Sequence, residues 1–72
     1  MNPIDMNGMV LSIGDLVVCP KNAQGTTWDH GIIEHIRDNG EIIIGYGVRR
    51  VQDLHMACHS YPEKACDIRK TV

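Results

Sequence analysis

Short apolar runs rich in β-branched residues, separated by turn residues, divide the first half of the chain and predict β-strands. We expect the first strand over residues 15–19, between a Gly-Asp turn and Pro20, which cannot donate a hydrogen bond to a sheet. We expect the second strand over residues 29–37. Its apolar positions change phase, so a β-bulge near Glu34 or His35 is needed to keep them on one face.

Turn residues set the next boundaries. Asp38-Asn39-Gly40 favours positive φ angles and predicts a tight hairpin into a third strand over residues 41–46. Apolar residues fall on both faces of this third strand, which predicts that it is covered on both sides. Beyond it we expect a strand over 48–52, a helical turn over 53–58 with Asp53 as its N-cap, a turn at 61–64, and a last strand over 65–70 that pairs with the first.

The composition indicates a mostly β fold with an aliphatic core. Nine Ile, six Val and three Thr stand against three Leu and three Ala, and Phe is absent. A chain of 72 residues buries only about 60% of the surface that its unfolded form exposes. We therefore expect one small domain without an enclosed active site of its own.

Three short motifs resemble the opening strands of Tudor and KOW domains. They are Ile13-Gly14-Asp15-x-Val17, Trp28-x-x-Gly31-x-Ile33-x-x-Ile36 and Gly40-x-Ile42-x-Ile44. The resemblance covers residues 13–56 and implies an all-β, five-stranded SH3-like barrel with one short helical turn before the last strand. Barrels of this kind bind methylated peptides, RNA, ribosomal proteins or polymerases, so the likeness indicates a fold more than a function.

Two narrower resemblances point to different functions. Residues 14–20 resemble the start of the Tudor-like polymerase-interacting domains of bacterial transcription factors, which implies docking on a protein through a sheet edge. Trp28, Gly31, Ile33, Tyr46 and Val51-Gln52 resemble in outline the type II dihydrofolate reductases, which are tetrameric enzymes with one shared pore. That family continues its motif with Ile-Tyr, where this chain has Asp53-Leu54.

We divide the chain into an N-terminal arm (1–12), a barrel domain (13–70) and a tail (71–72). The sequence has no run of about eighteen apolar residues and no basic, apolar leader at its start. Its three cysteines are an odd number, which fits a reducing compartment better than a secreted disulfide framework. We expect a cytoplasmic protein.

Charge is distributed unevenly, and this leaves a nucleic-acid alternative open. Residues 1–47 carry two basic and six acidic side chains, whereas residues 48–72 carry five basic and three acidic ones. A KOW- or Tudor-like domain that binds RNA or DNA would have to use this basic C-terminal third. The net charge of −2 favours a protein partner instead.

Histidines and cysteines gather near the C-terminus, and this leaves a zinc alternative open. The candidate ligands are His55, Cys58, His59 and Cys66. On a strand, the adjacent Cys58 and His59 point in opposite directions and cannot easily reach one ion. In an oxidised protein, Cys58 and Cys66 could form a disulfide instead. We predict no metal and no cofactor.

From these patterns we predict a non-catalytic protein-binding module. Such a module would be a small accessory or regulatory protein, of a size that suits a phage or a plasmid, docked on a larger cytoplasmic machine such as a transcription or translation complex. It would use a sheet edge and the 20–28 loop. The residues predicted to contact the partner are Trp28, Tyr46, Arg49 and Arg50, and those predicted to support self-association are Leu16, Val18 and Ile43.

Overall fold

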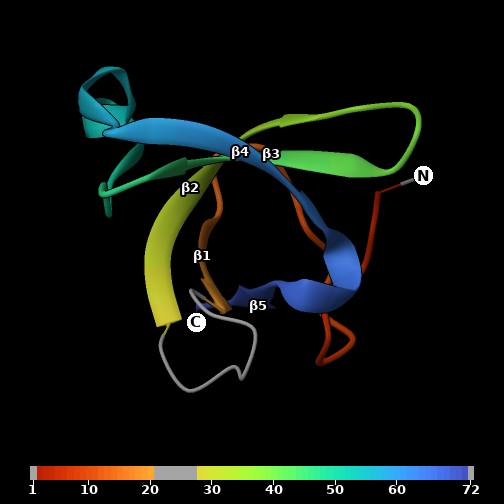
Figure 1. The fold of residues 1–72 in the computed structure, drawn as a ribbon. Helices are drawn as coiled ribbons and strands as arrows, with labels where there is room; N and C mark the ends of the chain where they lie inside the picture. Colours follow the sequence, from red (N-terminus) through yellow and green to blue (C-terminus); the bar gives the residue numbers. More distant parts are fainter. Residues whose placement is uncertain (1, 21–27, 72) are drawn as a thin grey trace.

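The computed structural model describes residues 2–20 and 28–71 (Figure 1). They form an all-β fold of five strands, as predicted. The strands are β1 (Leu16–Pro20), β2 (Trp28–Ile36), β3 (Glu41–Tyr46), β4 (His59–Lys64) and β5 (Arg69–Lys70), and two 3₁₀ helices, η1 (Val51–Met56) and η2 (Ala65–Asp67), precede β4 and β5. The predicted binding loop, apart from its ends at Pro20 and Trp28, falls outside the described residues.

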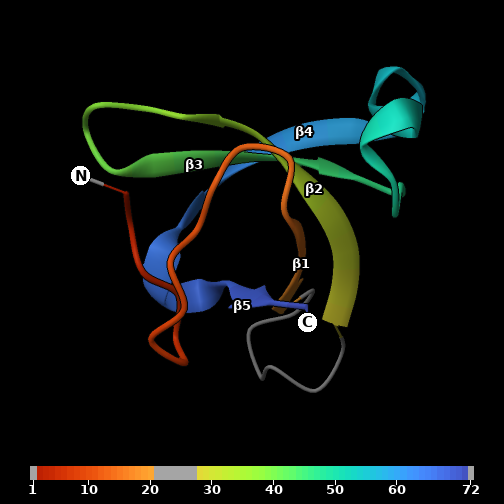
Figure 2. The same cartoon turned by 180° about the vertical axis from the view of Figure 1, so that it is seen from behind.

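All five strands belong to one antiparallel sheet with the order β4-β3-β2-β1-β5. The last strand pairs with the first, Val17 opposite Lys70, as the sequence predicts. Both views show a strongly bent sheet, in which β2 runs from the layer of β3 and β4 to that of β1 and β5 (Figures 1 and 2). No helix in the described parts of the chain has the length and apolar character needed to cross a membrane.

The predicted bulge and hairpin are both present. The pairing of β2 with β3 shifts between Ile33 and His35, so Glu34 is the extra residue. At the hairpin, Gly40 has a φ of 93°. The backbone N–H of Glu41 donates to the Asn39 side chain over 3.0 Å, which closes the turn.

The prediction for the C-terminal half was wrong in several places. Residues 48–52 are not a strand, because Gly47, with a φ of 87°, turns the chain away from the sheet and η1 begins at Val51. Asp53 lies inside the first turn of η1 instead of capping it. Residues 61–64, predicted as a turn, belong to β4, where Pro62 is tolerated because an edge strand has one unpaired side. Only residues 69–70 of the predicted last strand belong to β5, since 65–67 form η2.

The core lies on the concave side of the sheet and is mainly aliphatic. Its members are Leu11, Val17, Cys19, Ile33, Ile42, Ile44, Tyr46 and Ile68. Leu11 comes from the segment that we assigned to the N-terminal arm, so this segment packs into the domain. Among these described members, Tyr46 alone carries a hydroxyl group, which makes it the polar end of the cluster.

Asp5 holds the N-terminal segment to the end of the chain. Its carboxylate is only 5% exposed and accepts hydrogen bonds from the backbone N–H groups of Asn7 (2.9 Å), Met9 (2.7 Å) and Lys70 (2.7 Å). The Lys70 ammonium group adds an ion pair with Asp15 at 3.2 Å. The hydrogen bond from Lys70 to Asp5 connects residues that lie 65 positions apart in the sequence.

Candidate functional site

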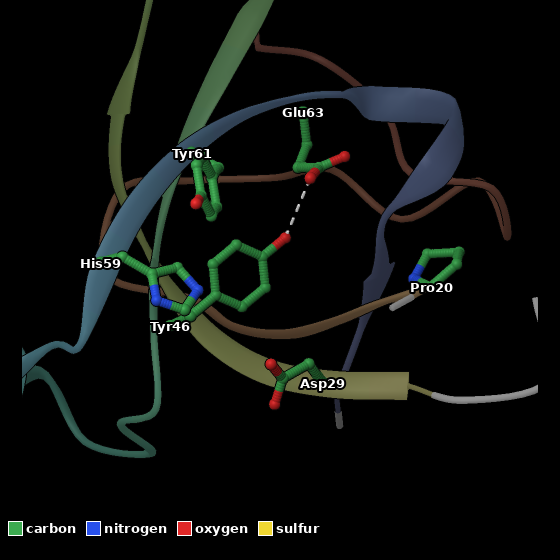
Figure 3. Close-up of a pocket in the computed structure, with 6 residues that line it drawn as sticks. All are labelled: Pro20, Asp29, Tyr46, His59, Tyr61 and Glu63. Atoms are coloured by element: carbon green, nitrogen blue, oxygen red, sulfur yellow. Dashed lines mark hydrogen bonds between the residues drawn. The ribbon is translucent and has the colours of Figure 1, made fainter. Parts of the chain in front are cut away.

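A pocket of about 210 Å³ opens at one end of the barrel, between β4 and the junction of β1 with β2 (Figure 3). We call it the ring pocket, because three of its side chains carry rings that lie close together. It is lined by Pro20, Asp29, Tyr46, His59, Tyr61 and Glu63. Figure 3 shows the Tyr46 ring between Asp29 and Glu63, with His59 and Tyr61 on the β4 side.

The pairing of β4 with β3 explains why three of these residues share one face. Side chains alternate along a strand, so His59, Tyr61 and Glu63 all point to the same side of the sheet. Their partners on β3 are Tyr46, Ile44 and Ile42, all of which are core residues. The inner face of β4 therefore continues the core toward solvent, and the side chains at this border are polar or aromatic.

The rings lie at contact distance and are tilted relative to one another. The centroids of His59 and Tyr61 are 4.8 Å apart, those of Tyr46 and His59 are 5.5 Å apart, and those of Tyr46 and Tyr61 are 6.3 Å apart, with interplanar angles of 35–55°. Tyr61 is 55% exposed. Part of its aromatic surface is therefore available to a ligand.

Tyr46 joins the pocket to the core. Its side chain is 6% exposed, and its hydroxyl donates a hydrogen bond to Glu63 Oε1 over 3.1 Å. Burial first, and then the neighbouring Cys19 and Glu63, raise the pKa of Tyr46 well above its ordinary value. The hydroxyl therefore keeps its proton and serves as a fixed donor at the floor of the pocket.

Cys19 lies behind Tyr46 and is fully buried. The pKa of its thiol is raised to about 11, mainly by burial; a hydrogen bond with Tyr46 acts to lower it, and the charges of Glu63, Asp67 and Asp29 act to raise it. A thiol with this pKa is protonated at neutral pH and is a poor nucleophile. Cys19 is therefore a packing residue.

Two carboxylates give the pocket an acidic character. Asp29 comes from β2 and Glu63 from β4, and both are half-buried. Among the described residues, three ion pairs form, and they involve Glu41, Asp53 and Asp15 instead. Within the described parts of the chain, no Lys or Arg forms an ion pair with Asp29 or Glu63.

The structure brings one of the four predicted partner-contacting residues, Tyr46, into the ring pocket. Trp28 precedes Asp29 on β2, and the Arg69 guanidinium lies 4.8 Å from the centre of its ring. Arg49 and Arg50 are exposed beside η1. They line a different hollow together with Gly47, Val48, Asp53 and Met56.

The residues predicted to support self-association lie on the outer face of the sheet. Val18 is 7% exposed, and Leu16 and Ile43 are half-buried. Helix η1 packs against β2 on the way to β4 and covers part of the sheet. Self-association through these residues stays a prediction.

The zinc candidates are spread over separate elements. His55 lies on η1, Cys58 precedes β4, His59 lies on β4 and Cys66 lies on η2. Nowhere in residues 2–20 and 28–71 do three or more His, Cys, Asp or Glu side chains gather as a metal would require. All three cysteines are free thiols.

Sequence reasoning missed Asp29, Tyr61 and Glu63 as site residues and named His59 only as a zinc candidate. A signal was present in the period-two spacing of His59, Tyr61 and Glu63. It was hidden because Tyr61-Pro62-Glu63-Lys64 resembles a turn.

Comparison with known proteins gives one match. The profile of a family described as a domain of unknown function (DUF7205) matches residues 3–68. No curated protein and no solved structure matches the chain. The matched range includes the whole ring pocket and the segment held by Asp5.

Proposed function

The chain belongs to the DUF7205 family of domains of unknown function, and we propose that it is a non-catalytic protein-binding module that docks on a larger protein through the ring pocket. The observation that carries this proposal is the exposed aromatic surface of His59 and Tyr61 beside a half-open acidic pocket. Tyrosine is enriched at protein interfaces, because its ring offers a large contact area at a small entropic cost.

The edge of the sheet supports the same proposal. Among the described strands, β4 has β3 as its one neighbour in the sheet. The other side of its backbone is left to pair with an extended segment of a partner. Pro62 lacks an N–H and interrupts that row of donors, so a partner would pair with part of the edge and place a side chain in the pocket.

Two observations weigh against the other functions. Of the five basic residues in the C-terminal third, Arg50 and Lys70 form ion pairs with carboxylates, which reduces the charge available for phosphate. For the reductase alternative, Val51-Gln52 begins a 3₁₀ helix and is exposed. A protein partner remains the better choice.

We further propose that the domain is an SH3-like barrel that works in the cytoplasm. Support for the barrel comes from the pairing of the last strand with the first and from the 3₁₀ turn before the last strand. The free thiols of Cys58 and Cys66, both exposed, support a reducing compartment.

Comparative capture from a lysate of the natural host tests the docking proposal. The baits are the wild-type protein, Tyr61→Ala, and Met56→Ala as the control, since Met56 is 66% exposed and does not line the ring pocket. We expect a protein that the wild-type and Met56→Ala baits retain and the Tyr61→Ala bait loses. Its purified form should bind the wild-type protein directly. Equal capture by all three baits would contradict docking through the pocket.

A further inference from the structure

The charge and shape of the ring pocket restrict what can enter it. Carboxylates from two different strands, Asp29 on β2 and Glu63 on β4, lie on either side of the Tyr46 ring (Figure 3). They repel anions, including the phosphates of a nucleic acid, and attract cations. The pocket therefore favours a positively charged group.

The rings favour an organic cation. Aromatic faces attract ammonium and guanidinium groups through the quadrupole of the ring. Asp29, His59 and Glu63 do not form a metal-ligand cluster in the described structure. A metal ion is thus a poorer occupant than a cationic side chain.

The same end of the molecule already holds one pair of this kind. The Arg69 guanidinium lies over the ring of Trp28, 4.8 Å from its centre, and Trp28 is the neighbour of Asp29 in the sequence. Arg69 is thereby engaged outside the ring pocket, since the pocket lining does not include it. Because Trp28 and Asp29 are adjacent on β2, their side chains point to opposite faces of the sheet, and a second guanidinium group in the ring pocket would lie on the other face from Arg69.

Hydrogen-bonding capacity distinguishes arginine from lysine. Glu63 Oε1 already accepts a hydrogen bond from the Tyr46 hydroxyl. Donors from a ligand must therefore reach the other oxygen of Glu63 and the oxygens of Asp29, which lie on opposite sides of the Tyr46 ring. A guanidinium group has five donors in a planar fork and can also stack on a ring. An ammonium group has three donors around a point and cannot stack.

We infer that the ring pocket binds the guanidinium group of an arginine side chain carried by the partner protein, between the exposed rings of His59 and Tyr61 and the carboxylates of Asp29 and Glu63. This inference rests on the proposed docking function and names the side chain that it recognises. No bond forms or breaks, and the ligand keeps its charge.

Titration of the full-length protein with three short peptides, followed by NMR, tests the inference. The probes are acetyl-Gly-Arg-Gly-amide, the matched lysine peptide and the matched citrulline peptide, which keeps the planar shape and loses the charge. We expect saturable shifts of the Tyr61 and His59 ring signals with the arginine peptide, with a dissociation constant in about the millimolar range for a single side chain. Lysine should bind at least about threefold more weakly, and citrulline should not saturate.

Variants separate the two parts of the site. Asp29→Asn and Glu63→Gln should each weaken the arginine peptide by about threefold, since each removes one charge from a partly exposed pair. Tyr61→Phe should bind nearly as the wild type does, whereas Tyr61→Ala should lose about threefold or more, because the ring and not the hydroxyl faces the ligand. Glu41→Gln, which removes a carboxylate outside the pocket whose side chain is 41% exposed, is the matched control.

The outcomes distinguish failure of the inference from failure of the proposed function. Equal binding of the arginine and citrulline peptides, or no saturable binding of the arginine peptide, would overturn the inference even if Tyr61-dependent capture of a protein succeeds. Saturable arginine binding that Glu41→Gln weakens as much as Glu63→Gln does would also overturn it. Selective arginine binding without any Tyr61-dependent protein would support the pocket chemistry and refute the docking function.

Discussion

Removing the charge of Asp5 should destabilise the whole domain, although Asp5 lies in the segment that the sequence presents as an arm. The change is Asp5→Asn, which keeps the size of the side chain. The new amide oxygen can still accept the N–H groups of Asn7 and Met9, but its NH₂ group would face the N–H of Lys70, donor against donor. The link between the two ends of the chain is then lost.

The expected loss is a large part of the total stability. A hydrogen bond to a charged group contributes about 1.5–3 kcal/mol, and leaving a buried donor unpaired adds to the cost. We therefore expect Asp5→Asn to lower the free energy of unfolding by about 2–4 kcal/mol. A domain of this length has about 4–11 kcal/mol in total, so the variant should be marginal at room temperature.

Urea unfolding measured at several pH values checks this reasoning. Burial alone would raise the pKa of Asp5, but the N–H groups of Lys70, Met9 and Asn7 and the charge of Lys70 hold it below its ordinary value of 3.8. Because the pKa of Asp5 is lower in the folded state, the ionised carboxylate stabilises that state above pH 3.8. This stabilisation is lost as the pH falls through the pKa that Asp5 has in the folded state. The difference between wild type and variant should thus be constant near neutral pH and shrink in acid.

Asp38→Asn, in the exposed hairpin turn, is the control for Asp5→Asn and should change the free energy of unfolding by less than about 0.5 kcal/mol. Two results would refute the argument. One is a loss below about 0.5 kcal/mol in Asp5→Asn at pH 7, within the range of ordinary surface substitutions. The other is a difference from the wild type that stays the same size down to pH 3, well below the ordinary pKa of Asp5.

Three further predictions concern the core and the pocket floor. Gly31→Ala should cost about 1–3 kcal/mol in urea unfolding, because the new methyl group would run into an isoleucine side chain of β3; an unchanged midpoint would contradict this. In the folded protein, Cys58 and Cys66 should react with iodoacetamide while Cys19 does not until urea is added, as read by mass spectrometry. Tyr46→Phe should cost about 1 kcal/mol in unfolding, since it removes the donor to the pocket carboxylate; no loss would show that this bond contributes nothing.

Local patterns predicted the first three strands well because their boundaries depend on neighbouring residues. Gly40 supplies the positive φ that the hairpin needs. The change of phase of the apolar positions around Glu34 predicts the bulge. The errors begin after Gly47. There the fate of each segment depends on which strand it meets, and residues 59–64 become a strand because β3 offers them a free edge.

The candidate site depends on the same non-local pairing. His59, Tyr61 and Glu63 share a face only if residues 59–64 are extended, and Pro62 hides this in the sequence. Asp29 joins them across the barrel from β2, a relation that no local pattern contains. Tyr46 was named from the sequence as a partner-contacting residue, and it lines the pocket.

Tyr46 also shows how so small a domain can hold a defined site. The core fixes its ring, while its hydroxyl and the neighbouring His59 and Tyr61 face the pocket. The floor of the pocket is therefore as rigid as the core, whereas its β4 wall has one neighbouring strand and fewer restraints. Because the pocket is half-open to water, one cationic side chain gains little there. The proposed docking would then be firm only where the partner also pairs with the backbone of β4, so that side-chain and main-chain contacts form together.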